Sequence, residues 1–343
     1  MAVSIRDVAA RAGVSVGTAS NVLNRPERVN ADAVRRVHDA IAELGFVRND
    51  AARQLRAGRS RSVGLVVLDA GNPFFAELAR GAQARAAEAG LAVLLASTDG
   101  DAAQEDAYLD LFEEQRVTGV LISPQGEGSP RIARLRAHGI RCVLVDREAD
   151  DPDVSSVAVD DVAGGRLAVS HLLGLGRRRI AVVGGPTSVR QVADRLTGAR
   201  EAVAAVPGAT LEEIPTDALS VLAGRDAGRA VADRPAATRP DAVFAANDLL
   251  AVGVLQALVL QGDVRVPEDV ALIGYDDIAF ASATVVPLSS VRQPSALIGR
   301  PPSSCCSTPS RATCSSSPSW SSGRPRAGSP ASGAARGRVA GAG

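Results

Sequence analysis

The spacing of apolar residues changes near residue 62, and this change divides the chain into two parts. Before it, apolar residues recur every three or four positions, which is the period of one buried helix face. After it, short apolar runs alternate with stretches of helical spacing, the pattern of parallel strands joined by helices. The sequence therefore predicts a small all-α head followed by a larger α/β body.

The beginning of the chain predicts two short helices joined by a tight turn. Ile5 and Val8 start a buried helical face, and Gly13 suits the left-handed end of that helix. Ser15 is placed to cap a second helix, which buries Val22. The cap and the outward side of this second helix carry small or polar residues, namely Ser15, Val16, Gly17, Thr18, Ser20 and Asn21. This arrangement predicts a helix-turn-helix, whose second helix enters the major groove of DNA.

After a third helix expected over 31–44, residues 50–56 predict a very short fourth helix. Asn49 is a good cap for it, and Asp50 suits its first turn. So short a helix does not persist alone in water. We therefore expect this segment to become helical only when another surface packs on it; a flexible Arg-rich linker is the alternative.

Two successive sets of apolar runs predict two lobes in the body. The first set comprises residues 63–68, 92–96, 120–122 and 142–145, and the second comprises 157–159, 180–183, 211–214, 242–245 and 270–273. Helical stretches separate these runs, so each set predicts a doubly wound parallel sheet with helices on both faces. Ligands of such sheets bind beyond the carboxyl ends of the strands. A pocket is therefore expected between the two lobes.

Polar and aromatic residues that follow the predicted strands are the candidates for lining this pocket. They are Asn72, Phe74, Phe75, Asp146, Arg195, Asn247, Asp276 and Gln293. Taken singly, each polar residue is also consistent with a helix cap or a surface charge. Together they combine carboxylates, amides, a guanidinium group and aromatic rings.

Three segments of the head resemble the LacI family of bacterial transcription regulators. They are Asp-Val-Ala at 7–9, Ala-Gly-Val-Ser at 12–15 and Asn-Val-Leu-Asn at 21–24. The two expected lobes likewise resemble the periplasmic-binding-protein fold. The resemblance implies a regulator, most often a repressor, that binds a pseudo-palindromic operator as a homodimer or a larger assembly. It also implies control by a small-molecule effector, a sugar or sugar derivative, and no cofactor.

The resemblance extends to the short helix after the head. Asn49, Ala52, Arg53 and Leu55 match the family's hinge helix, which folds against its twin in the dimer when operator DNA is bound. Leu55 stands where the family inserts a leucine into the minor groove, as a wedge that unstacks a base step. Where the family usually has proline, this chain has Arg48, so the entry turn lacks that rigidity.

In sugar-binding members of the family, the positions that match the candidate pocket residues bind the ligand. Carboxylates, an arginine and an asparagine contact the sugar hydroxyls, and aromatic side chains lie against the ring. A sugar requires such groups because each unmatched hydroxyl leaves a costly unpaired partner.

Charge is unevenly distributed although the net charge of the 343 residues is zero. Residues 1–62 hold 11 Arg and six Asp or Glu, whereas residues 63–300 hold 22 Arg and 32 Asp or Glu. A basic head on an acidic body fits binding of a polyanion at one end. No apolar run has membrane length and the start lacks a signal-peptide core, so we expect a cytoplasmic protein without a membrane partner.

Catalytic and metal motifs are weak in this sequence, which favours a protein that is not an enzyme. The chain has no Lys for a phosphate-binding loop, and the glycines in 182–186 lack dinucleotide spacing. His38, His138 and His171 are not at metal or triad spacing, and the four Cys form no zinc pattern. The rival interpretation is a sugar-binding module without DNA regulation, against which the basic head and the hinge segment argue.

These patterns predict four segments and set the last one apart. They are the DNA-binding head at 1–46, the hinge at 47–62, the effector-binding and dimerisation body at 63–300 with lobes at about 63–155 and 156–291, and a tail at 301–343 that departs from the family. The tail holds 12 Ser and six Pro and no acidic residue, as expected of a disordered extension.

A shifted reading frame is a second explanation of the tail. Written in GC-rich codons and displaced by two bases, residues 302–310 read Val-Glu-Leu-Leu-Leu-Asp-Ala-Val, which resembles the amphipathic helix expected here in the family. Residues 318–323 treated in the same way give Glu-Leu-Val-Val-Arg, which resembles the family's closing strand. We interpret the tail as frameshifted, so an inactive regulator is an alternative to a functional one.

Overall fold

The computed structural model describes residues 3–46, 60–126, 130–260, 264–301, 313–316 and 319–321. The chain divides into two units, Met1–Ser60 and Arg61–Gly343. The hinge candidates Asn49, Ala52, Arg53 and Leu55 lie outside the described residues. No helix in the described ranges is both long and apolar enough to cross a membrane.

The head consists of three helices, α1 (Ile5–Ala12), α2 (Val16–Asn24) and α3 (Ala31–Leu44), with a 3-10 turn η1 (Pro26–Arg28). Gly13 ends α1 in the left-handed conformation at φ 64°. Ser15 caps α2, because its Oγ accepts a hydrogen bond from the Thr18 amide at 3.0 Å. Asn30 caps α3 through the Ala33 amide at 2.7 Å. The apolar faces of the three helices then meet in one small core that includes Val8, Ala19, Val22 and Val37.

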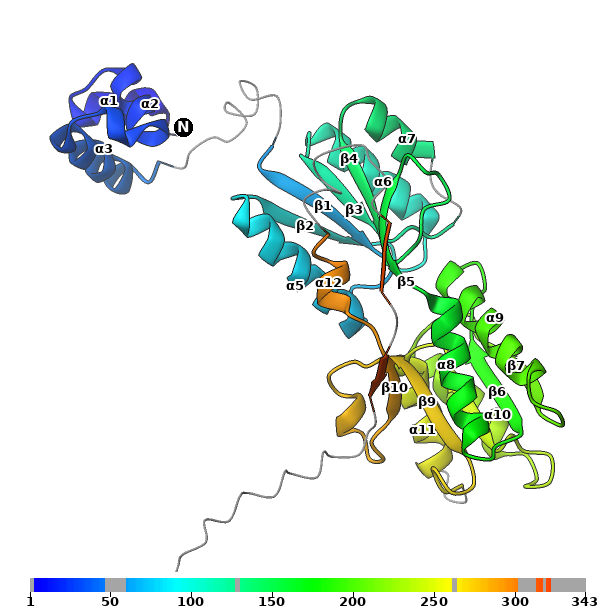
Figure 1. Ribbon diagram of the computed structural model, residues 1–343. Helices are drawn as coiled ribbons and strands as arrows, with labels where there is room; N and C mark the ends of the chain where they lie inside the picture. The colour runs from blue at the N-terminus through cyan, green and yellow to red at the C-terminus, as the bar shows by residue number, and fades with distance from the viewer. Residues whose placement is uncertain are drawn as a thin grey trace, which may run out of the picture. The chain divides into compact units, whose positions relative to one another are not determined.

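Two six-stranded sheets form the body, each flanked by helices (Figure 1). The first sheet has the order β11-β5-β4-β3-β1-β2, with β1 (Ser62–Val67), β2 (Ala92–Ser97), β3 (Gly119–Ile122), β4 (Arg141–Val145), β5 (Ser155–Val159) and β11 (Thr313–Ser316). Its helices are α5 (Pro73–Glu88), α6 (Ala102–Glu114), α7 (Pro130–Ala137) and the short α12 (Ser295–Ile298). All pairs in this sheet are parallel.

The second sheet repeats this plan in the order β12-β10-β9-β8-β6-β7. Its strands are β6 (Arg179–Gly184), β7 (Thr210–Pro215), β8 (Ala242–Ala245), β9 (Ala271–Asp276), β10 (Ser289–Arg292) and β12 (Ser319–Ser321). Its helices are α8 (Asp161–Gly174), α9 (Arg190–Ala204), α10 (Val221–Ala232), α11 (Asp248–Leu260) and the 3-10 turn η2 (Ala281–Ala283). Only the pair of β10 and β12 is antiparallel within the described strands. The inner strands β6, β8 and β9 are buried on both faces, which explains their continuous apolar runs, whereas the edge strand β7 is mostly exposed.

The boundary expected between the lobes at 155/156 is corrected by strand β5. Residues 157–159 were expected to open the second lobe, but β5 pairs with β4 in the first sheet, with Val145 opposite Val157. An apolar run shows that a strand is buried and does not show which sheet it joins. The chain therefore passes from the first lobe to the second between β5 and α8.

Two short segments of the tail form strands at sheet edges. β11 extends the first sheet beside β5, and β12 extends the second beside β10, with Trp320 opposite Val291. Strand pairing at a sheet edge uses main-chain groups, so a Ser-rich segment without apolar periodicity still forms it. The rest of residues 302–343 lies outside the described residues.

Candidate functional site

Arg195 on α9 is the centre of a buried group of charged side chains in the second lobe. Its Nε donates to Asp161 Oδ1 at 2.8 Å, and its Nη1 donates to the Ala246 carbonyl oxygen at 2.6 Å. Nη1 also lies 3.9 Å from Asp276 Oδ1, and the guanidinium carbon lies 3.7 Å from the centre of the Tyr275 ring. Arg195 is only 4% exposed. Its charge is thus held by carboxylates of the protein itself.

Close packing of α8 on α9 places this arginine. A Cβ added at Gly165 would lie 2.0 Å from the Arg195 carbonyl oxygen, and one added at Gly198 would lie 1.9 Å from the Val162 carbonyl oxygen. Any larger residue at either position would force the helices apart. The two glycines therefore set the distance at which Arg195 meets Asp161 at the start of α8.

Gln293, which follows β10, holds Asp276 at the end of β9. The Gln293 Nε2 atom donates to Asp276 Oδ1 at 2.8 Å. Asp276 has φ 108° and Asp146, at the end of β4, has φ 59°, both in the region that favours glycine. Such backbone conformations cost about 1–3 kcal/mol each and persist where the surroundings impose them, often at functional sites.

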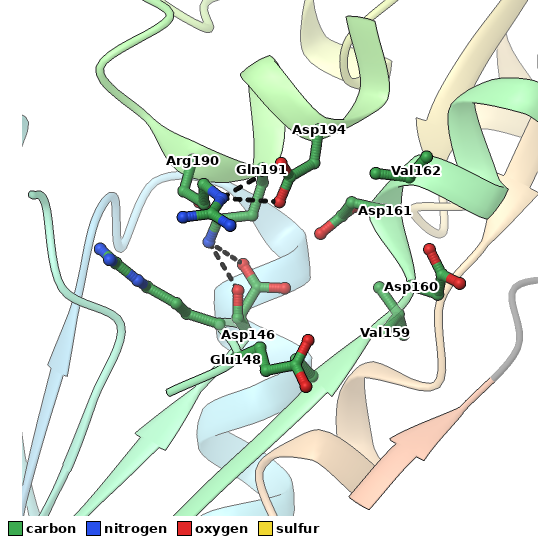
Figure 2. Close-up of a pocket in the computed structure, with 11 residues that line it drawn as sticks. Asp146, Glu148, Val159, Asp160, Asp161, Val162, Arg190, Gln191 and Asp194 are labelled. Carbon is green, nitrogen blue, oxygen red and sulfur yellow. Dashed lines mark hydrogen bonds and ion pairs between the residues drawn. The ribbon is translucent and has the colours of Figure 1, made fainter. Parts of the chain in front are cut away.

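Gln191 and Asp146 connect the two lobes (Figure 2). Gln191 lies in the first turn of α9 in the second lobe, and Asp146 follows β4 in the first. The Gln191 Nε2 atom donates to the Asp146 carbonyl oxygen at 2.7 Å and to its Oδ2 at 3.0 Å. Among the described residues, no hydrogen-bond partner contacts Asp146 Oδ1 or Gln191 Oε1.

A cavity of about 300 Å³ lies beside this pair, between the lobes. The described residues that line it are Asp146, Arg147, Glu148, Ala158, Val159, Asp160, Asp161, Val162, Arg190, Gln191 and Asp194. Asp146 is the one of the eight effector candidates chosen from the sequence that belongs to these described lining residues. Arg147 and Glu148 follow Asp146 after β4, and the other lining residues come from the end of β5, the start of α8 and the first turns of α9.

Burial raises the pKa values of the carboxyl groups at this site. The pKa of Asp146 lies well above its usual range because the side chain is buried and because Asp161 is a neighbouring carboxylate. Burial also raises the pKa of Asp276 to about 6, although Arg195 and the hydrogen bond from Gln293 oppose the shift. The site thus favours a neutral carboxyl group or a nearby positive charge.

The remaining effector candidates are buried and act as caps, core residues or supports. Asn72 caps α5 through the Phe74 amide at 3.0 Å and also lowers the pKa of Asp276 by a hydrogen bond. The rings of Phe74 and Phe75 pack edge to face with centroids 5.0 Å apart. Asn247 accepts from the Leu250 amide at 2.9 Å at the start of α11. Their expected contact with a ligand stays a prediction.

In the head, the side of α2 that the sequence predicts to face DNA is largely exposed to solvent. Val16 is 45% exposed, and Gly17 and Asn21 are exposed as well. Thr18 and Ser20 are half-buried; the Thr18 hydroxyl bonds with Ser15 Oγ at 2.9 Å. The small exposed surface of α2 leaves its backbone open to close approach by another molecule.

Comparison with known proteins agrees with both units. Residues 4–49 match the family model described as bacterial regulatory proteins, lacI family. Residues 60–309 match the one described as periplasmic binding proteins and sugar binding domain of LacI family. The chain belongs to the LacI family of bacterial regulatory proteins, which confirms the resemblance and the two-part fold expected from the sequence. It is a transcriptional regulator with a DNA-binding head.

Individual relatives cover nearly the whole chain. The ribose operon repressor of Escherichia coli (strain K12) is 35% identical over 302 residues, which is 86% of this chain and 89% of that protein. The HTH-type transcriptional regulator CelR of Thermobifida fusca is 37% identical over 302 residues, 85% of this chain and 87% of that protein. These relatives are transcription regulators.

Solved structures of regulators are similar to this chain over most of its length. The complex of the transcriptional regulator CelR with cellobiose has a TM-score of 0.68 at 31% identity and covers 93% of this chain and 98% of that chain. The lac repressor dimer bound to operator and the anti-inducer ONPF has a TM-score of 0.79 at 25% identity, again covering 93% and 98%.

Proposed function

We propose that the protein is a repressor that binds a pseudo-palindromic operator as a homodimer or a larger assembly. A sugar or sugar derivative in the interlobe cavity changes its affinity for that operator. The observation that carries the proposal is the pair of hydrogen bonds from Gln191 to Asp146, which join the lobes beside the cavity. A ligand that binds there contacts both lobes, so its affinity depends on how they are arranged.

The DNA side of the proposal rests on the exposed surface of α2. Val16, Gly17 and Asn21 face base edges, while Ser15, Thr18 and Ser20 border them on the same side. The hinge residues Asn49, Ala52, Arg53 and Leu55 contribute a minor-groove contact, a role that rests on their match to the family pattern. The proposed repressor acts in the cytoplasm, where operator DNA lies.

The size of the cavity favours a small effector. Ligand pockets span about 300–1,000 Å³, and a cavity of about 300 Å³ is at the lower end of that range. We therefore favour a monosaccharide, such as the ribose named in the ribose operon repressors, over a disaccharide such as the cellobiose bound by CelR.

A titration of operator affinity tests the proposal. Operator binding is measured by fluorescence anisotropy with and without each member of a panel of monosaccharides. At least one sugar is expected to change the operator Kd by about fivefold or more. A protein that binds sugars but not operator DNA would be the rival sugar-binding module.

One observation also favours the alternative of a frameshifted, poorly active product. A groove of about 250 Å³ lies in the first lobe beside Pro301, the first residue of the Ser- and Pro-rich tail. Apolar residues of α5 and of strands β1, β3 and β4 line it, including Ala86, Val120 and Val143. The displaced reading of residues 302–310 supplies leucines that suit such a groove, whereas the Ser-rich sequence does not.

A further inference from the structure

Two buried side-chain oxygens beside the interlobe cavity, Gln191 Oε1 and Asp146 Oδ1, have no hydrogen-bond partner among the described residues. Gln191 Oε1 is an acceptor, and Asp146 Oδ1 is an acceptor when the carboxyl group is ionised. Gln191 faces two oxygens of Asp146, so its amide nitrogen must point toward them and its Oε1 is left over. Asp146 Oδ1 is likewise left over within the described residues. Both side chains are more than nine-tenths buried and line the cavity. In Figure 2 the free carboxylate oxygen of Asp146 points away from Gln191, toward the side of Asp161.

The charged groups around the cavity also favour a ligand that donates hydrogen bonds or carries a positive charge. Its described lining contains five carboxyl groups and two guanidinium groups. Both guanidinium groups are already engaged, since Arg190 pairs with Asp194 at 3.1 Å and Arg147 pairs with Asp150 at 3.4 Å. The nearby Arg195 is held by Asp161. Two of the lining carboxyl groups, Asp161 and Asp194, are engaged in the same ion pairs. The excess of carboxyl groups over guanidinium groups still leaves the lining acidic.

We propose that the cavity takes an amino sugar: a monosaccharide-sized ligand whose ammonium group donates hydrogen bonds to Asp146 and Gln191. This inference rests on the proposed function and specifies the chemistry of its effector. We expect a phosphorylated sugar or a sugar acid to bind less well, because its anionic group would meet more carboxyl groups than guanidinium groups. A neutral sugar binds through hydroxyl donors, but more weakly.

The electrostatics of Asp146 agree with a cationic partner. Burial and the neighbouring Asp161 raise the pKa of Asp146, so an adjacent ammonium group would bring it back down. Binding of the amine is therefore expected to release protons from the protein. Binding of the neutral parent sugar is expected to release fewer.

Isothermal calorimetry on matched ligands tests this proposal with the full-length protein. The probes are glucosamine, galactosamine and mannosamine, the three parent hexoses, and the 6-phosphates of those hexoses, at about pH 6.5, below the usual pKa of an amino group. In at least one series the amine is expected to bind about tenfold more tightly than the parent, since hydrogen bonds to charged groups are the stronger ones. No 6-phosphate is expected to bind measurably.

Two variants locate the effect. Asp146→Asn keeps the size of the side chain and removes its charge, and it should bring amine and parent within about threefold of each other. Asp153→Asn removes the same charge from an exposed residue that does not line the cavity, and it should keep the preference. Circular dichroism and thermal melting check that both variants fold. Repeating the titration in buffers of different ionisation enthalpy should show proton release for the amine.

The proposal is overturned if the parent or the phosphate binds more tightly in every series, if no amine binds, or if Asp146→Asn retains the preference. These results differ from a failure of the proposed function. A sugar phosphate that binds and changes operator affinity would leave the regulator intact and reject the amino sugar. A protein without operator affinity would reject the regulator whatever it binds.

Discussion

Gln191 in the second lobe donates two hydrogen bonds to Asp146 in the first, at 2.7 Å to the carbonyl oxygen and 3.0 Å to Oδ2. The contact joins elements that are far apart in the sequence, the end of β4 and the first turn of α9. It lies beside the cavity between the lobes. A ligand in that cavity would lie against the same two side chains that join the lobes.

Removing the amide of Gln191 should weaken effector binding. Gln191→Ala leaves Asp146 Oδ2 without its donor and removes one wall of the cavity, so sugar affinity should fall about tenfold or more, as for loss of a hydrogen bond to a charged group. Calorimetry measures the affinity. Thr197→Ala is the control on α9, because its hydroxyl bonds to the Ala193 carbonyl oxygen on the exposed side. Equal affinities for wild type and Gln191→Ala would contradict the assigned site.

Asn21 should contribute to base recognition. Asn21→Ala is expected to cost about 1–3 kcal/mol of operator binding and to relax the preference at one base position. Anisotropy titrations with operator variants measure both effects. Asp39→Asn on α3 is the control, since it is an exposed charge change within the same head. An equal loss on operator and random DNA would show that Asn21 only positions the backbone.

Asp248 should make the body less stable as pH rises. Burial raises the pKa of Asp248 to about 8, and its hydrogen bonds with Ser290 Oγ and the Ile278 amide do not offset this. The folded state thus keeps a proton that the unfolded chain loses near pH 4, so stability falls as pH rises toward 8. Between about pH 6 and pH 8, ionisation of Asp248 should lower the free energy of unfolding by about 2–3 kcal/mol.

Urea unfolding at several pH values checks this dependence. Asp248→Asn cannot ionise, so its free energy of unfolding should fall less than that of wild type between about pH 6 and 8. Asp269→Asn is the control, because its exposed partner Arg265 lowers the Asp269 pKa to about 2, outside this window. Parallel pH profiles for wild type and Asp248→Asn would contradict the assignment.

Restoring the displaced reading frame should stabilise the body. Replacing residues 302–323 with the translation of that frame supplies leucines for the groove beside Pro301. Each large apolar side chain buried contributes about 1.5–3 kcal/mol, so the melting temperature should rise by at least about 5 °C. A version with those leucines changed to serine is the control. If both versions have the same melting temperature as the original chain, that segment does not bind in the groove.

The pattern of apolar runs was sufficient to predict both lobes, because strands of a parallel sheet are buried on both faces. The same pattern could not assign residues 157–159 to one sheet or the other, because a buried strand of either sheet has the same apolar pattern. That error also hid Asp161, which follows β5 and would have been found as a strand-end residue of the first lobe. Gln191 carried a weaker signal: it precedes Arg195 by four positions and so lies on the same helix face.

Reciprocal titration of effector and operator tests the central claim, that a ligand between the lobes controls DNA binding. The operator Kd is measured with and without saturating sugar, and the sugar Kd with and without operator. Linkage requires the same factor in both directions, and we expect about fivefold or more for the wild type and a smaller factor for Gln191→Ala. A sugar that binds the protein yet leaves the operator Kd unchanged would contradict the account.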